Sequence, residues 1–227
     1  MKSKIEELAN RGFIVDGIEN KYSDTSLEQR LELLISNLPC ERTLGARLLE
    51  NYLDLKVIDC LIDALIKEKK LYSKIEICNS LVSFGKDAVI PLIHLLGKIG
   101  NNQYAVIPEA HFKKVSYPLP RDIAGRTLIR IGTIALPDLV EGLGSDDLCK
   151  LSELIDVIGF ICFYEHQPKL LEPLKECFYR NEEHDLIKWK IFRAMSAFPE
   201  SISFLKEQQE DSTRLKSEIE RSLSLNP

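Results

Sequence analysis

The sequence predicts an all-α protein in which short antiparallel helices form pairs and the pairs stack as a right-handed α-solenoid. The clearest pair spans residues 74–96, where apolar side chains recur every three or four positions on both sides of a turn at Gly85. Two helices of this length cannot cover their own apolar stripes, so neighbouring pairs must cover them. The first stripe comprises Ile75, Cys78, Leu81 and Val82, and the second comprises Val89, Leu92, Ile93 and Leu96.

A second observation is that the second helix of this pair recurs along the chain. Each copy has the pattern Leu-apolar-polar-x-apolar, in which the leading position and the positions one and four residues later are expected to face the core. Loops of unequal length between constant helix pairs explain the uneven spacing. About six pairs are predicted. The leading leucines are Leu34, Leu61, Leu92 and Leu139, with weaker copies at Leu174 and Leu205.

The most specific pattern lies in the pair at residues 121–143. It resembles a HEAT repeat of the short, phycobilisome-lyase-like type, and the resemblance extends over roughly residues 25–210. It implies an armadillo-type α-solenoid with first helices on the convex face and second helices on the concave face. Most proteins with such repeats are scaffolds, so it implies no single activity. The pattern consists of Arg121, Asp122, Ala124, Gly125, Leu128 and Ile131-Gly132, followed by Ala135-Leu136-Pro137-Asp138-Leu139-Val140.

Taken in order, the elements predict a single domain over residues 1–227. Residues 1–38 form an N-terminal capping unit, in which Thr25 and Glu28 have the spacing of a capping box and open a helix that runs to Asn37. A short helix over 2–11 and a loop over 13–24 precede it. The repeats occupy residues 40–210, with clear helix pairs at 40–67, 71–98 and 121–143.

The last third of the chain continues the array. Residues 147–164 are apolar around most of the helix, which predicts a buried first helix near the middle of the stack. Helical segments at 168–180 and 186–209 follow. A final capping helix at 211–224 is expected to expose Glu218, Glu220 and Arg221 to solvent.

One insertion interrupts the array. Residues 100–120 contain three prolines and no helical period after Pro108, which predicts an extended loop. Such loops are often functional, so its aromatic side chains are candidate anchors for a partner. The alternative is a passive insertion that packs its aromatic residues on the next helix. The candidates on this loop are Tyr104, His111, Phe112 and Tyr117.

A polar stripe follows the second helices. The residue two positions after each leading leucine points away from the core, toward the concave wall that the resemblance implies. Four of these six residues are acidic, which predicts a surface that receives a basic segment of a partner protein. The alternative is an ordinary solvated face. The residues are Ser36, Asp63, His94, Glu141, Glu176 and Glu207.

Composition narrows the function classes. The 227 residues carry a formal net charge of −5, so general attraction to nucleic acid is not expected. The start of the chain has no apolar signal region, and the longest apolar run, residues 157–164, is far too short to cross a bilayer. The six cysteines contain no Cys-x-x-Cys pair. A cytoplasmic protein with reduced thiols, no membrane span, no metal and no cofactor is expected.

Three classes of enzyme or ligand carrier share this architecture with scaffold proteins. Metal-dependent HEAT hydroxylases use His-Glu pairs, but this chain has only the reversed pair Glu165-His166. DNA glycosylases of this architecture need a cationic cradle with aromatic residues, and Trp189 is the single tryptophan. A bilin lyase-like protein would hold its ligand in a pocket. The favoured interpretation is a non-catalytic protein-binding adaptor; the alternative is a bilin lyase-like or DNA glycosylase-like protein with a site under the 100–120 loop.

Overall fold

The computed structural model describes residues 2–52, 54–110 and 112–226. This part of the chain is all-α and contains no β-strand. It forms two compact units, which divide between Pro91 and Leu92. Over the same residues, none of the helices has both the length and the apolar character that a bilayer span requires. The single continuous array stays a prediction, because each unit is compact by itself.

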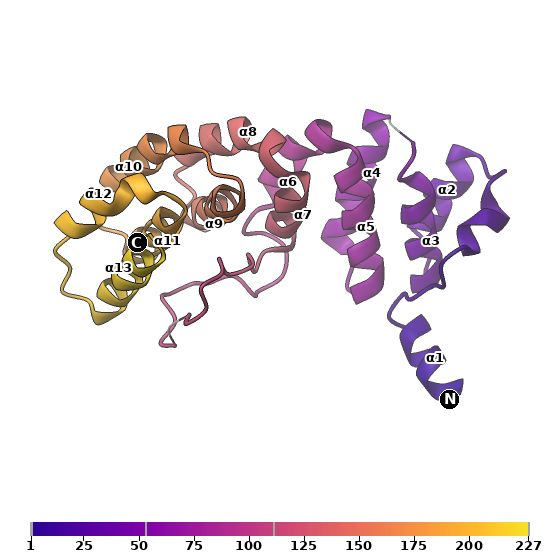
Figure 1. Cartoon of the computed structure of the whole chain (residues 1–227). Coiled ribbons are helices and arrows are strands. Elements are labelled where there is room, and N and C mark those ends of the chain that lie inside the picture. Colours follow the sequence, from indigo (N-terminus) through magenta and orange to yellow (C-terminus); the bar gives the residue numbers. More distant parts are fainter. Residues whose placement is uncertain (1, 53, 111, 227) are drawn as a thin grey trace. The chain divides into compact units, whose positions relative to one another are not determined.

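The first unit stacks consecutive helices on one another (Figure 1). Helix α3 packs against both α2 and α5, and α4 packs against α5. Helix α6 begins in this unit and ends in the next. A 3-10 helix at Ile18–Tyr22 replaces part of the loop predicted at 13–24. The α-helices are α1 (Lys2–Ala9), α2 (Leu27–Leu34), α3 (Pro39–Leu49), α4 (Leu55–Lys67), α5 (Leu71–Ser83) and α6 (Val89–Leu95).

The capping box of α2 lies one residue later than predicted. The Ser26 hydroxyl accepts the main-chain N–H of Gln29 at 3.3 Å, and the Gln29 side chain accepts the N–H of Ser26 at 2.8 Å. Thr25 instead donates its hydroxyl to the carbonyl of Tyr22. The helix also ends at Leu34 and does not reach Asn37.

The apolar stripe of α5 is rotated from its predicted place. Ile75 is 41% exposed, whereas Ile77 is fully buried. The reason is a polar contact with α3: the hydroxyls of Ser73 and Ser80 donate to the carbonyls of Pro39 and Ala46. Because these serines occupy the face toward α3, the core stripe shifts round the helix. The predicted turn at Gly85 is confirmed by its positive φ of 54°.

The second unit repeats the same construction. Helices α7, α9, α11 and α13 pack successively, and α8, α10 and α12 form a second row beside them (Figure 1). The predicted buried helix at 147–164 is confirmed as α9, which starts where the Asp147 carboxylate accepts the N–H groups of Cys149 and Lys150. The helices are α7 (Ile123–Ile131), α8 (Leu136–Glu141), α9 (Leu148–Tyr164), α10 (Leu171–Arg180), α11 (Asp185–Ala194), α12 (Ile202–Glu207) and α13 (Thr213–Leu225).

Two predictions for the last third are wrong. The segment 186–209 is not one helix, because α11 ends at Ala194 and two 3-10 turns, the second opening at Pro199, precede α12. Glu218 is not on the wet side of α13, since it is only 4% exposed. It faces α11, where Arg193 pairs with its carboxylate at 3.3 Å, and Arg221 pairs with it at 3.0 Å.

The 101–120 insertion packs on helices α9, α11 and α13 within the second unit. The Tyr104 ring meets Trp189 of α11 edge-on, with ring centroids 5.3 Å apart. Tyr117 is 2% exposed and lies against the aromatic rings of α9. Helix α13 holds the loop through main-chain contacts, because Arg214 and Arg221 donate to loop carbonyls at 3.2 and 3.0 Å. The tyrosines of the loop therefore pack on α9 and α11, and binding of a partner by the loop stays a prediction.

Candidate functional site: a pocket between α2 and α4

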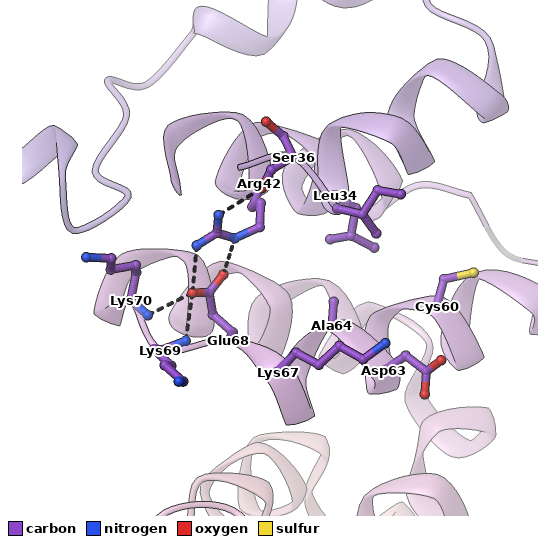
Figure 2. A pocket seen from close by; sticks show the side chains of 11 residues that line it. Leu34, Ser36, Arg42, Cys60, Asp63, Ala64, Lys67, Glu68, Lys69 and Lys70 are labelled. Carbon is purple, nitrogen blue, oxygen red and sulfur yellow. Dashed lines mark hydrogen bonds and ion pairs between the residues drawn. The ribbon is translucent and has the colours of Figure 1, made fainter. Parts of the chain in front are cut away.

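The first unit contains an open pocket of about 630 Å³ between the end of α2 and the outer side of α4 (Figure 2). Both segments carry the recurring Leu-apolar-polar-x-apolar pattern, and Ser36 and Asp63 of the predicted polar stripe line the pocket. The linker between α4 and α5 and one side chain from α3 complete it. The lining residues are Leu34, Ile35, Ser36, Arg42, Cys60, Asp63, Ala64, Lys67, Glu68, Lys69 and Lys70.

The floor of the pocket is apolar. Leu34 is almost fully buried, Cys60 and Ala64 are half-buried, and Ile35 is 78% exposed. The sequence predicted that Ile35 and Leu38 face the core, which is wrong: Leu38 is 58% exposed. The physical reason is that α2 ends at Leu34, so the helical period that would turn both side chains inward stops before them. Ile35 thus adds an exposed apolar side chain to the edge of the pocket.

One end of the pocket is fixed by an ion pair. The Arg42 guanidinium grips Glu68 with two hydrogen bonds, Nε to Oε2 at 2.7 Å and Nη2 to Oε1 at 3.0 Å. It also donates to the carbonyls of Ser36 and Asn37 just after α2. Arg42 therefore ties the end of α2 to the α4–α5 linker, and Figure 2 shows its bonds to Glu68 and Ser36.

The Glu68 carboxylate is buried and accepts four hydrogen bonds. Its side chain is 1% exposed, and Oε1 also accepts the main-chain N–H groups of Lys69 and Lys70 at 2.8 and 2.7 Å. Burial by itself raises the pKa of Glu68, but the bonds from Arg42 and the two amides outweigh it and lower that pKa below its ordinary value. Glu68 thus stays ionised and neutralises Arg42.

The rim of the pocket is cationic. Lys67, Lys69 and Lys70 are exposed, and none of the three ammonium groups has an ion-pair partner in the part of the chain that the structure describes. Asp63, one turn before Lys67 on α4, is the only other charged residue in the lining. Three cations against one anion reverse the sign of a chain whose formal net charge is −5. The run Lys67-Glu68-Lys69-Lys70 is the sequence signal that could have indicated this rim.

Five of the six residues of the predicted polar stripe are exposed and Ser36 is half-buried, and the structure places the six in different units. Ser36 and Asp63 line the pocket in the first unit. The remaining four residues lie in the second unit, and their contact with a partner stays a prediction. These exposed residues are His94, Glu141, Glu176 and Glu207.

The candidates on the 101–120 loop fall into three cases. Tyr104 and Phe112 are half-buried, with the Arg121 guanidinium 3.8 Å from the Tyr104 ring centroid and Arg221 over Phe112. Tyr117 is buried, so it packs the loop and offers no surface to a partner. His111 lies outside the described residues.

A smaller pocket of about 320 Å³ separates the loop from α13. It is the place where the predicted alternative, a ligand site under the loop, would lie. Its charged groups include Lys113 and Lys114, together with Glu218 and Arg221, which pair with each other. Across the described residues, no group of three or more His, Cys, Asp or Glu side chains is placed to hold a metal ion.

No protein-family model and no curated protein matches this chain. The likeness to HEAT repeats therefore rests on the residues of 121–143 and on the stacked helix pairs within each unit. The pocket between α2 and α4 is the site with the best-defined geometry.

Proposed function

We propose that this protein is a non-catalytic adaptor, a HEAT-like α-solenoid that binds a partner protein through the surface of its second helices. The pocket between α2 and α4 would be the anchor point, taking one bulky apolar side chain of the partner. The observation that carries the proposal is an open pocket whose apolar lining combines the buried Leu34, the half-buried Ala64 and the exposed Ile35.

The chemistry of the pocket favours anchoring over catalysis. Interfaces concentrate their binding energy in a few side chains that fill desolvated pockets. A floor of aliphatic groups with charges confined to the rim suits such an anchor. A general acid or base would need a carboxylate free to exchange protons, whereas Glu68 is held by Arg42 and two amides.

The test is to fill the pocket and follow partner capture. Ala64→Trp places an indole over the floor, whereas Ile66→Trp adds the same group at an exposed position of α4 outside the lining. Wild type and both variants serve as baits in a native lysate, and captured proteins are quantified by mass spectrometry. Thermal unfolding of each bait checks that the helices remain folded.

We expect a partner that is retained by wild type and Ile66→Trp and lost by Ala64→Trp. Equal capture by all three baits would remove the pocket from the function. The predicted loop site would then be tested by the same design, with a variant of the exposed loop residue Lys113 and small-ligand screening.

A further inference from the structure

We infer that the partner segment filling this pocket is acidic: a short stretch of a partner protein with one bulky apolar side chain flanked by Asp or Glu residues. This inference rests on the proposed function and adds the chemistry of the partner. The sequence alone predicts a basic segment, because that prediction considers one polar position on each second helix. Of these residues only Ser36 and Asp63 line the pocket.

The first step is the state of the rim cations. Of the four basic residues in the lining, Arg42 is fully engaged with Glu68 and with two main-chain carbonyls. Lys67, Lys69 and Lys70 keep their ammonium groups in solvent, without an ion pair among the described residues. Complementary charge on a partner would orient it over the floor and speed its association.

The second step is that the Glu68 carboxylate forms no ion pair with these lysines in the part of the chain that the structure describes. Glu68 is flanked in sequence by Lys67 and Lys69, yet its oxygens accept from the Arg42 guanidinium and from the main-chain amides of Lys69 and Lys70. Here Glu68 is buried and bonded to Arg42 and two main-chain amides, so the three exposed ammonium groups remain available to anions of a partner.

The third step separates an acidic peptide from other polyanions. Single-stranded nucleic acid binds through aromatic stacking platforms beside basic grooves, and among the described residues no aromatic side chain lines this pocket. The rim is also a local feature of a chain with net charge −5, which works against binding to a long polyanion or an anionic lipid surface. An apolar floor with three lysines along one side, all from residues 67–70, matches a single apolar side chain flanked by carboxylates.

The experiment uses the full chain labelled with ¹⁵N and capped synthetic peptides with a central Leu or Phe. In the acidic peptides the centre is flanked on both sides by Glu; in the matched peptides Ser or Lys replaces Glu, and a fourth set has Gly at the centre. A single-stranded oligonucleotide and phosphatidylserine vesicles are the comparison polyanions. Amide shifts of residues 34–36 and 60–70 report binding at the pocket.

The charge variant is Lys69→Glu with Lys70→Glu, and its matched control is Lys56→Glu with Lys86→Glu. Both pairs change the net charge equally, and the control pair lies in the same unit, exposed and outside the lining. The test pair leaves Glu68 supported, because the bonds that it accepts from residues 69 and 70 come from main-chain amides.

We expect saturable binding of the acidic peptides with a central Leu or Phe, weakened about tenfold by the Lys69/Lys70 pair and little by the control pair. Added salt should weaken it as well. Equal or tighter binding of the Ser- or Lys-flanked peptides, no peptide binding, or preferred binding of the oligonucleotide or vesicles would overturn the inference. Lysate capture that is lost with Ala64→Trp but unchanged by the charge pair would leave the adaptor proposal standing and refute this inference alone.

Discussion

Arg42 should be a main structural support of the pocket, and Arg42→Ala tests this directly. The substitution removes two hydrogen bonds to Glu68 and two to carbonyls at the end of α2. Removing one partner of a buried ion pair costs about 3–5 kcal/mol. Because Glu68 keeps two amide donors and the Arg42 side chain is 20% exposed, we expect a smaller loss, about 2–3 kcal/mol.

Urea unfolding followed by far-ultraviolet circular dichroism measures this loss, with Lys67→Ala as the control on the same rim. Since two compact units can unfold separately, hydrogen exchange at the amides of Lys69 and Lys70 locates the effect. These amides donate to Glu68 in the wild type. Both amides should exchange faster in Arg42→Ala than in wild type, and at the wild-type rate in Lys67→Ala.

The pH dependence of the free energy of unfolding provides a second, independent test of the role of Arg42. The pKa of Glu68 is lowered in the folded protein, so its stabilising effect is present above the ordinary carboxyl pKa of about 4.5 and is lost as the pH falls through the folded value. The difference between wild type and Arg42→Ala should therefore shrink on acidification. A loss below about 0.5 kcal/mol at neutral pH, the range of ordinary surface substitutions, would refute the role given to Arg42.

Three further predictions concern the second unit and the whole array. Gly159→Ala should cost about 1–3 kcal/mol and loosen the 101–120 loop in hydrogen exchange, because a Cβ there would lie 2.1 Å from the Tyr117 hydroxyl; wild-type exchange would contradict the packing of Tyr117. Burial raises the pKa of Glu153, so the fold favours its protonated form. The contribution of Glu153 to the free energy of unfolding is therefore fully present below its ordinary pKa of 4.5 and is lost as the pH rises through its folded pKa. Unfolding titrations should show this loss in wild type and its absence in Glu153→Gln, and parallel curves would refute it. A compact globule of 227 residues has a radius of gyration of about 17 Å. If the two units form a solenoid, small-angle X-ray scattering should give a radius of gyration clearly above this value. A measured radius near about 17 Å would exclude the solenoid.

Elements with a strong local signal could be predicted from the sequence. Helix α9 has an Asp147 cap and a long apolar run, and both signals lie within the element itself. The start of α2 shows the limit of such signals: Thr25 and Ser26 are adjacent, and each is followed three residues later by a capping partner. The structure distinguishes them because the Thr25 hydroxyl donates to the Tyr22 carbonyl and Ser26 is left to cap the helix.

The pocket depends on contacts between distant segments, which the repeat pattern does not contain. Its floor exists because α2 stops at Leu34, and its fixed end exists because Arg42 of α3 meets Glu68 beyond α4. The burial of Tyr117 likewise needs the space left by Gly159 on α9. The lysine run at 67–70 was visible in the sequence, but its significance depends on Glu68 turning toward Arg42.

Alkylation of Cys60 tests the central claim most directly, because this thiol lines the pocket. Cys149 is exposed in the second unit and serves as the internal control. Burial raises the pKa of Cys162 to about 12 and of Cys177 to about 11, so both thiols should stay largely unreactive. Iodoacetamide modification is followed by peptide mass spectrometry with and without the captured partner. Slower modification of Cys60 alone in the complex is the predicted result, and an unchanged Cys60 rate with partner bound would contradict the account.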